Sequence, residues 1–140
     1  MAKMISTVLA ECNRLKSREE RIEYLQKNNT TPLRDILRIA FDDDVVSIMP
    51  IGSPPYKADD APDGYEKSTL HKEYKKFRFF FKGGAPGVTQ IKRETMFINM
   101  LETIHFSEAE LLIAAKDKNL SYRAITKKLV QDAFPNLIKI

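Results

Sequence analysis

Residues 71–84 read HKEYKKFRFFFKGG and combine the densest aromatic run of the chain with its densest cations. As a helix turning about 100° per residue, this stretch separates into an apolar face and a basic face. The apolar face carries Leu70, Tyr74, Phe77 and Phe81. The basic face carries Lys72, Lys75, Lys76 and Lys82. The ring of Phe79 then falls exposed among the lysines, which is unusual because burial favours hiding such a ring.

The same stretch also permits a strand, because Phe77, Phe79 and Phe81 alternate along residues 76–82. Aromatic residues favour strands, and periodicity does not decide over so short a run. A helix is the favoured interpretation, and the placement of Phe79 on an exposed basic face depends on it.

Upstream of this stretch, the sequence predicts short helices. Apolar residues recur at helical spacing over residues 3–13. Ser17 and Glu20 form a capping box for a second helix. That helix is expected to end at Asn28-Asn29, because asparagine tolerates the left-handed conformation.

A third helix is predicted to start at Thr31-Pro32, with a threonine cap and a proline in the first turn. An apolar stripe runs along it, while Arg34 and Arg38 lie together on its flank. We expect Asp42-Asp43-Asp44 to end it, since clustered carboxylates repel one another and oppose the negative end of the helix dipole.

Residues 45–67 are predicted to form a long Pro-rich acidic loop. Pro50 to Gly64 holds four prolines and two glycines, which are turn and polyproline signals. Loops of this length are uncommon inside compact domains and are often functional. The loop either straps the surface or contacts a partner. Val45 to Met49, just before it, can be extended.

Downstream, the glycine-rich run 83–87 predicts a turn, and a long helix follows from about Val88 to Ile104. The turn is interpreted as an interhelical connection, with a phosphate cradle as the weaker alternative because Pro86 removes one N–H donor. The residues expected to face inward on the long helix are Ile91, Phe97, Ile98, Leu101 and Ile104.

Two more helices are predicted near the end of the sequence. Ser107 and Glu110 form a second capping box, for a helix that ends near Lys118-Asn119. Ser121 is expected to cap the last helix, which ends before Pro135.

These patterns predict an all-α fold of six or seven helices in one compact domain, residues 1–140. The N-terminal helical part covers residues 1–44, the loop 45–67 and the C-terminal helical part 68–140. Cys12 is the only cysteine, which excludes an intramolecular disulfide and is typical of a reducing cytoplasm. No apolar run approaches the roughly 20 residues that cross a bilayer, so no membrane span is expected.

The net charge of +4 conceals a segregation of charge along the chain. Residues 42–66 hold seven acidic and one basic residue, whereas residues 67–93 hold eight basic and one acidic. Adjacent blocks of opposite charge create a strong local field. The simplest interpretation is that Asp59, Asp60 and Asp63 neutralise the basic face internally.

Known catalytic and metal-binding patterns are absent from the sequence. His71, His105 and Cys12 provide neither a zinc cluster nor a nucleophile and base pair. Residues 59–70 are superficially similar to a calcium loop, but Ala61 and Leu70 occupy ligand positions. A non-enzymatic binding protein without cofactor or metal is therefore expected.

The basic aromatic stretch is the strongest functional signal. Lysines neutralise phosphates and an aromatic ring stacks on an unpaired base, a combination common in proteins that bind single strands. A solvated lysine face over an aromatic core is the alternative. The candidate residues for binding single-stranded nucleic acid, or a host or viral protein, are Lys72, Lys75, Lys76, Phe79, Lys82, Lys92 and Arg93.

Several short motifs resemble a family of small uncharacterised proteins of T4-like bacteriophages, from marine or cyanobacterial hosts. They are Pro54-Pro55-Tyr56, Pro62-Asp63-Gly64, Gly83-Gly84, Arg93-Glu94-Thr95-Met96-Phe97, Ala114-Ala115-Lys116-Asp117-Lys118 and Ala133-Phe134-Pro135. The resemblance implies a phage protein in the host cytoplasm. It favours an accessory role in nucleic-acid transactions or host takeover, with a virion or assembly component as the alternative.

Overall fold

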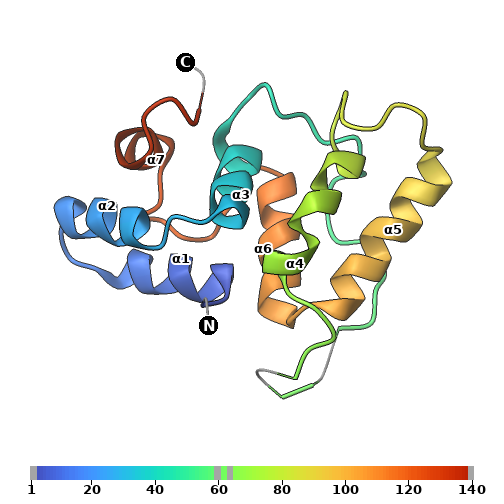
Figure 1. Ribbon diagram of the computed structural model, residues 1–140, viewed down its shortest axis with the longest axis horizontal. Coiled ribbons are helices and arrows are strands. Elements are labelled where there is room, and N and C mark those ends of the chain that lie inside the picture. The colour runs from blue at the N-terminus through green and yellow to red at the C-terminus, as the bar shows by residue number, and fades with distance from the viewer. Residues whose placement is uncertain (1–2, 59–60, 63–64, 139–140) are drawn as a thin grey trace.

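The computed structural model describes residues 3–58, 61–62 and 65–138, and this part of the chain is helical (Figure 1). The elements are α1 (Ile5–Arg14), α2 (Arg18–Lys27), α3 (Thr31–Phe41), α4 (Leu70–Glu73), the 3-10 helix η1 (Tyr74–Phe80), α5 (Gln90–Thr103), α6 (Phe106–Lys116) and α7 (Lys127–Ala133). In these ranges there is no strand, only an isolated antiparallel bridge between Ser47 and Phe81. The predicted all-α fold in one compact domain is confirmed, with seven α-helices in the described part.

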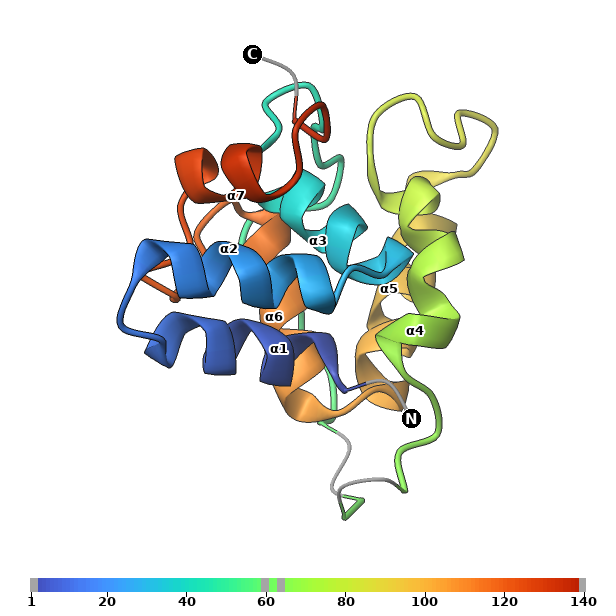
Figure 2. The ribbon, with the colours of Figure 1, turned by 60° about the vertical axis from the view of Figure 1, so that its left-hand side comes forward.

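The core forms where α6 meets α3, α5 and α1 (Figure 1 and Figure 2). The apolar stripe of α3 is fully buried at Leu33, Ile36 and Leu37, as is Leu112 of α6. α2 packs against α1 and α7, and an Arg18–Asp132 ion pair joins α2 to α7. Helices from both ends of the sequence therefore share one core.

α2 begins and ends where the sequence predicts, but the backbone conformation at its end differs from the expected one. The Ser17 hydroxyl accepts a hydrogen bond from the Glu20 N–H at 3.1 Å and lies 3.0 Å from the Glu20 carboxylate, which confirms Ser17 as the N-cap. Asn28 ends the helix at φ −102°, so the expected left-handed conformation is wrong. Its side-chain amide donates to the Tyr24 carbonyl at 2.8 Å, which also accepts from the Asn28 backbone N–H at 3.1 Å.

α3 ends at the aspartate run as predicted, and the structure adds specific contacts at this end. Asp42 is buried, and its carboxylate accepts a hydrogen bond from the Asp44 N–H at 2.9 Å, forming a local turn. Lys118 donates to the carbonyls of Ile39 and Asp42, both at 2.8 Å, and thus caps the helix from outside. At the other end Thr30, one residue before the predicted position, is the N-cap.

α5 starts at Gln90 after a Thr89 cap and extends to Thr103. Phe97, Leu101 and the following Ile104 are buried as predicted. Ile91 is not, because it lies in the first turn of α5 and is 82% exposed.

The caps predicted for the last two helices are wrong. The imidazole of His105 is the cap of α6: its Nδ1 accepts a hydrogen bond from the Ser107 N–H at 3.1 Å, which replaces the capping box. Thr126, not Ser121, caps α7 by accepting from the Leu129 N–H at 3.1 Å. The end of α7 at Ala133, before Pro135, is confirmed.

Between α3 and α4 the described residues contain no helix. The loop is tied to the end of η1 by the bridge, in which Ile48 N–H donates to the Phe80 carbonyl at 3.0 Å and Lys82 N–H donates to the Val46 carbonyl at 2.8 Å. The predicted contact of Asp59, Asp60 and Asp63 with the basic face lies outside the described residues.

Candidate functional site

The basic aromatic stretch is helical as far as Phe80. One α-helical turn, α4, continues as the 3-10 helix η1, and Phe81 is extended. The helical interpretation of residues 76–82 is thus confirmed for 76–80, while the last two residues leave the helix for the bridge with Ser47.

Phe77 and Phe81 are buried as predicted, and the 3-10 geometry adds Phe80 to the buried rings. Side chains three positions apart align in a 3-10 helix, so Phe77 and Phe80 point to the same side, and both are buried. The Phe80 ring meets the Phe97 ring of α5 edge-on, with centroids 5.0 Å apart. Phe80 therefore anchors the stretch to α5, a role that α-helical spacing did not predict.

Phe79 is partly buried. Its ring packs partly against the core, and the Arg78 guanidinium carbon lies 4.9 Å from the ring centroid. The expectation of an exposed ring is therefore wrong in degree. The Arg78 guanidinium covers part of the remaining ring surface and forms a cation–π contact with it.

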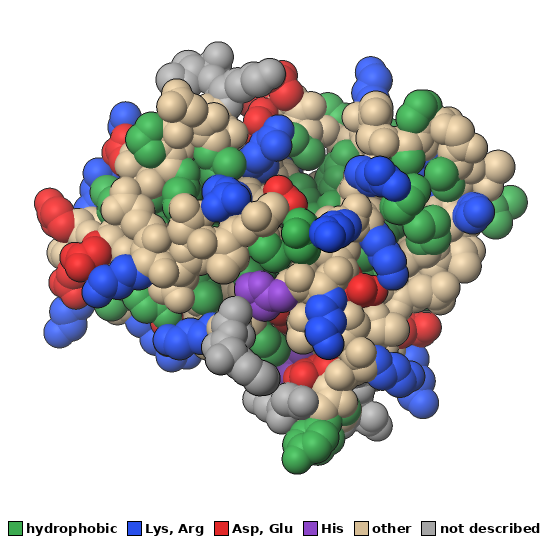
Figure 3. All heavy atoms as spheres, viewed as in Figure 1, with side chains coloured by type: hydrophobic (Ala, Val, Ile, Leu, Met, Phe, Trp, Pro, Cys, Tyr) green, Lys and Arg blue, Asp and Glu red, His purple; other side chains and the backbone are tan. Residues whose placement is uncertain are grey.

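The predicted lysines remain at the surface: Lys72, Lys75, Lys76, Lys82 and Lys92 are exposed. In Figure 3 Lys and Arg side chains gather on the face that carries α4 and η1. Within the described ranges the one ion pair made by these lysines joins Lys76 to Glu73, at 3.1 Å. We call Lys72, Lys75, Lys76, Arg78 and Lys82 the basic surface.

Arg93 is not part of this surface. Its buried guanidinium donates to the carbonyls of Phe79 and Ala85 at 2.5 and 3.0 Å, and to the side chain of Gln90 at 3.1 Å. These bonds hold the end of η1 and the glycine turn against α5. Arg93 is therefore a structural residue that sequence reasoning grouped with the surface cations.

In the glycine turn, residues 83–87, the backbone at Gly84 lies close to the backbone of Arg78 in η1. A Cβ added at Gly84 would lie 2.0 Å from the carbonyl oxygen of Arg78, so no side chain fits there, and Gly83 has φ +85°. The N-terminus of α5 beyond the turn is capped by Thr89, which accepts a hydrogen bond from the Lys92 N–H at 3.3 Å. The turn thus connects two helices.

A groove of about 320 Å³ lies between α3 and η1. Arg38 lines it from α3, and Lys75 and Arg78 line it from η1. Its aromatic lining residues are Tyr74, Phe77 and Phe81. The sequence did not predict this groove, because its lining residues lie about forty positions apart in the chain. The one indication was the basic flank of the third helix, formed by Arg34 and Arg38.

Asp35 is the one carboxylate among the residues that line the groove. Burial raises its pKa, while the nearby Arg38 and Arg34 act in the opposite direction. Arg38 is itself 3.9 Å from the carboxylate of Asp42. Three cations and one acid around a partly aromatic hollow favour an anionic ligand with a flat apolar part.

The described residues hold no metal-binding cluster and no activated thiol. No group of three His, Cys, Asp or Glu side chains in these residues could hold a metal ion. Burial raises the pKa of the Cys12 thiol to about 11, which leaves it as an unreactive thiol that donates to the Arg21 carbonyl. The Nε2 of His71 is hydrogen-bonded to the carbonyl oxygen of Lys3, at 2.7 Å.

Residues 8–122 match a protein family described as a family of unknown function, DUF6433. The chain belongs to this family. The DUF6433 match runs from α1 past α6 and so includes the basic surface and the groove. Comparison with curated proteins gives no match. Among the helices of the described residues, none is both long and apolar enough to cross a membrane.

Proposed function

We propose that this DUF6433 protein is a non-enzymatic accessory protein that binds single-stranded nucleic acid along the basic surface and the adjoining groove. The observation that carries the proposal is the groove itself, where Arg38, Lys75 and Arg78 line a hollow with aromatic residues. Cations neutralise phosphates and release counterions, and aromatic rings stack on bases of any sequence. Both kinds of group occur here. The cations line the groove, and the rings that a base can reach are the partly buried Tyr74 in the groove and Phe79 on the same 3-10 helix.

The state of the lysines supports the proposal. Lys72, Lys75 and Lys82 are exposed and form no ion pair with other described residues, so their charges are available to phosphates. Three anchors hold the stretch that carries them: the Phe80 ring on Phe97, the Arg93 bonds and the bridge to Ser47. Preorganised cations lose less entropy on binding than mobile ones.

The resemblance to T4-like phage proteins gives the proposed setting. There the protein acts in the host cytoplasm during viral nucleic-acid transactions or host takeover. The ligand is a single strand because a stacking ring reaches only unpaired bases.

A fluorescence anisotropy titration with a labelled 12-nucleotide single strand tests the proposal at about 50 mM salt, where phosphate contacts are strongest. If about four cations contact phosphates, log affinity falls with log salt at a slope near −3. Lys75→Glu with Arg78→Glu should abolish binding without unfolding the domain.

The matched control is Lys16→Glu with Lys27→Glu, which makes the same change in net charge at exposed positions near α2. It should keep most of the affinity and the same salt slope. Absence of binding at low salt, or an equal loss in both double variants, would refute the proposed function.

A further inference from the structure

A second hollow, separate from the basic surface, lies between the α3–α4 loop and α5. It has a volume of about 340 Å³. Residues 49–55 of the loop form one wall, and Glu94, Phe97 and Ile98 of α5 form the other. The lining is mainly apolar, and we call this hollow the apolar pocket.

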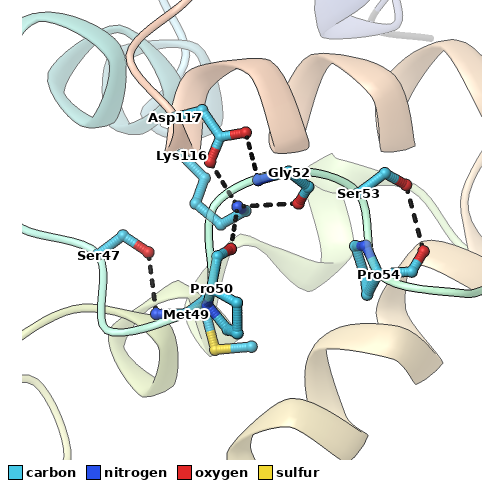
Figure 4. A network of polar contacts seen from close by, with 8 residues as sticks. All are labelled: Ser47, Met49, Pro50, Gly52, Ser53, Pro54, Lys116 and Asp117. Carbon is cyan, nitrogen blue, oxygen red and sulfur yellow. Dashed lines mark hydrogen bonds and ion pairs between the residues drawn. The ribbon is translucent and has the colours of Figure 1, made fainter.

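A buried ion pair holds the loop wall in place (Figure 4). The ammonium of Lys116 donates to the carbonyls of Pro50 and Gly52 at 2.8 and 3.2 Å, and to Asp117 Oδ1 at 2.6 Å. Asp117 Oδ2 accepts a hydrogen bond from the Gly52 N–H at 2.9 Å. The Lys116 side chain is only 1% exposed. Burying an ammonium is costly, so full satisfaction by these acceptors is required for the arrangement to persist.

The residue between the two clamped positions is Ile51, and it is 91% exposed. Pro50 and Gly52 are both fixed by the Lys116–Asp117 pair, so Ile51 is presented by an ordered backbone. Ile91, three residues before Glu94, is the other highly exposed isoleucine on this side of α5. Ile51 lines the apolar pocket, and Ile91 lies about one helical turn from Glu94 on α5, so the two exposed side chains mark an interaction surface rather than isolated surface residues.

Glu94 determines the chemistry of the partner. It is the one charged residue among those lining the apolar pocket, and among the described residues it has no ion pair or hydrogen bond through its carboxylate. A carboxylate at the edge of an apolar hollow attracts a cation and repels phosphate. The pocket is therefore complementary to an apolar group that carries a positive charge beside it.

We propose that the apolar pocket binds a peptide segment of a partner protein. A large aliphatic or aromatic side chain of the segment enters the pocket between the loop and α5. A neighbouring Lys or Arg pairs with Glu94, and Ile51 and Ile91 contact the flanking residues. The pocket is preformed because the Lys116–Asp117 pair fixes the loop, which reduces the entropy cost of binding.

The test is selection of a random 12-residue peptide display library on the full-length protein, followed by anisotropy titration of an enriched peptide. Enriched peptides should share a large apolar residue adjacent to Lys or Arg. Ile51→Asp and Glu94→Lys should each lower the affinity for the enriched peptide at least about tenfold, as expected for central contacts. Both changes lie at the surface, and circular dichroism verifies that the variants fold.

Two controls define the site. Tyr65→Asp alters another exposed apolar residue, and Lys75→Glu alters the basic surface; both should leave peptide affinity unchanged. The proposal is overturned if no peptide is enriched, if enriched peptides are acidic, or if Ile51→Asp and Glu94→Lys bind as the wild type does. Concentration-dependent dimerisation abolished by Ile51→Asp, without peptide binding, would identify a second copy as the occupant and also overturn it.

Discussion

Glu108 of α6 accepts a hydrogen bond from the Ser6 N–H in the first turn of α1, at 3.0 Å. Met4, the N-cap residue of α1, provides no side-chain cap, so the carboxylate from α6 takes its place. Its charge lies at the positive end of the α1 dipole. Glu108 is only 1% exposed, and its Oε1 has no hydrogen-bond partner in the described structure.

This contact predicts a pH dependence of stability. Burial raises the pKa of Glu108, while the Ser6 N–H and the nearby His71 act in the opposite direction. A carboxyl whose folded pKa exceeds its unfolded value stabilises the fold below the unfolded pKa, near 4.3, and this contribution is lost as pH rises through the folded pKa. The free energy of unfolding of the wild type minus that of Glu108→Gln should therefore decrease as pH rises above 4.

Urea denaturation between pH 4 and pH 8 measures this difference. Glu110→Gln, an exposed change on the same helix, should not show the same decrease. A difference that increased with pH would contradict the assignment.

Lys116→Met should lower the free energy of unfolding by about 3–5 kcal/mol, because it leaves Asp117 and two loop carbonyls without their buried cation. Lys128→Met removes an exposed ion pair with Asp132 and should change stability by less than about 1 kcal/mol. Chemical denaturation of both variants checks the contrast. Equal effects would mean that Lys116 does not fix the loop.

Gly84→Ala should lower the free energy of unfolding by about 1–3 kcal/mol, because the new methyl group collides with the Arg78 carbonyl. Gly87 lies in the same turn, and a Cβ there meets no atom within 4 Å. Gly87→Ala should be close to neutral. Thermal melting of the two variants compares them directly, and a neutral Gly84→Ala would refute the close approach.

Arg93 and Lys92 are adjacent but should respond differently. Arg93→Met removes three hydrogen bonds and should lower the free energy of unfolding by about 2 kcal/mol. Lys92 lies outside the basic surface as defined but is exposed and is one of the binding residues predicted from the sequence. Lys92→Met should therefore leave stability unchanged and reduce the salt slope of oligonucleotide binding by about 0.7, the value for one phosphate contact. Melting curves and salt titrations separate the two roles. Unchanged stability of Arg93→Met would contradict the structural role of Arg93.

Phe79→Ala should affect both binding and folding. Loss of stacking should weaken oligonucleotide binding by about 1–3 kcal/mol. Since the ring also packs partly against the core, stability should fall by about 1 kcal/mol. Anisotropy and denaturation of the same protein measure the two effects. Unchanged oligonucleotide affinity would exclude stacking on this ring.

Local signals predicted the first three helices and their limits to within about two residues, because apolar spacing and caps act within a few residues. The caps of α6 and α7 were missed because serine is the usual N-cap residue, whereas His105 and Thr126 occupy these positions. Along residues 70–81 an α-helical period correctly predicted that Leu70, Phe77 and Phe81 are buried. It overlooked Phe80, since the chain adopts 3-10 geometry there.

The candidate site was predictable only where it is local. The lysines of η1 were recognised from their density, but the part contributed by Arg38 and Asp35 depends on packing between distant segments. Arg93 looked like a surface cation because sequence does not indicate which arginine faces a carbonyl. Residue types were sufficient to predict a basic face. Long-range packing decided which residues belong to it, because it buries Arg93 and adds Arg38 from α3.

The pairing of early with late helices has a consequence during translation. α3 packs on α6, α2 on α7, and α1 on α6 as well as α2, so much of the surface that α1–α3 bury is supplied by residues 106–133. The nascent chain must therefore keep the apolar stripe of α3 uncovered until α6 has left the ribosome. At about 5–20 residues per second, this exposure lasts several seconds. Folding is thus expected to be completed after synthesis rather than progressively along the chain, and chaperones have that interval in which to bind.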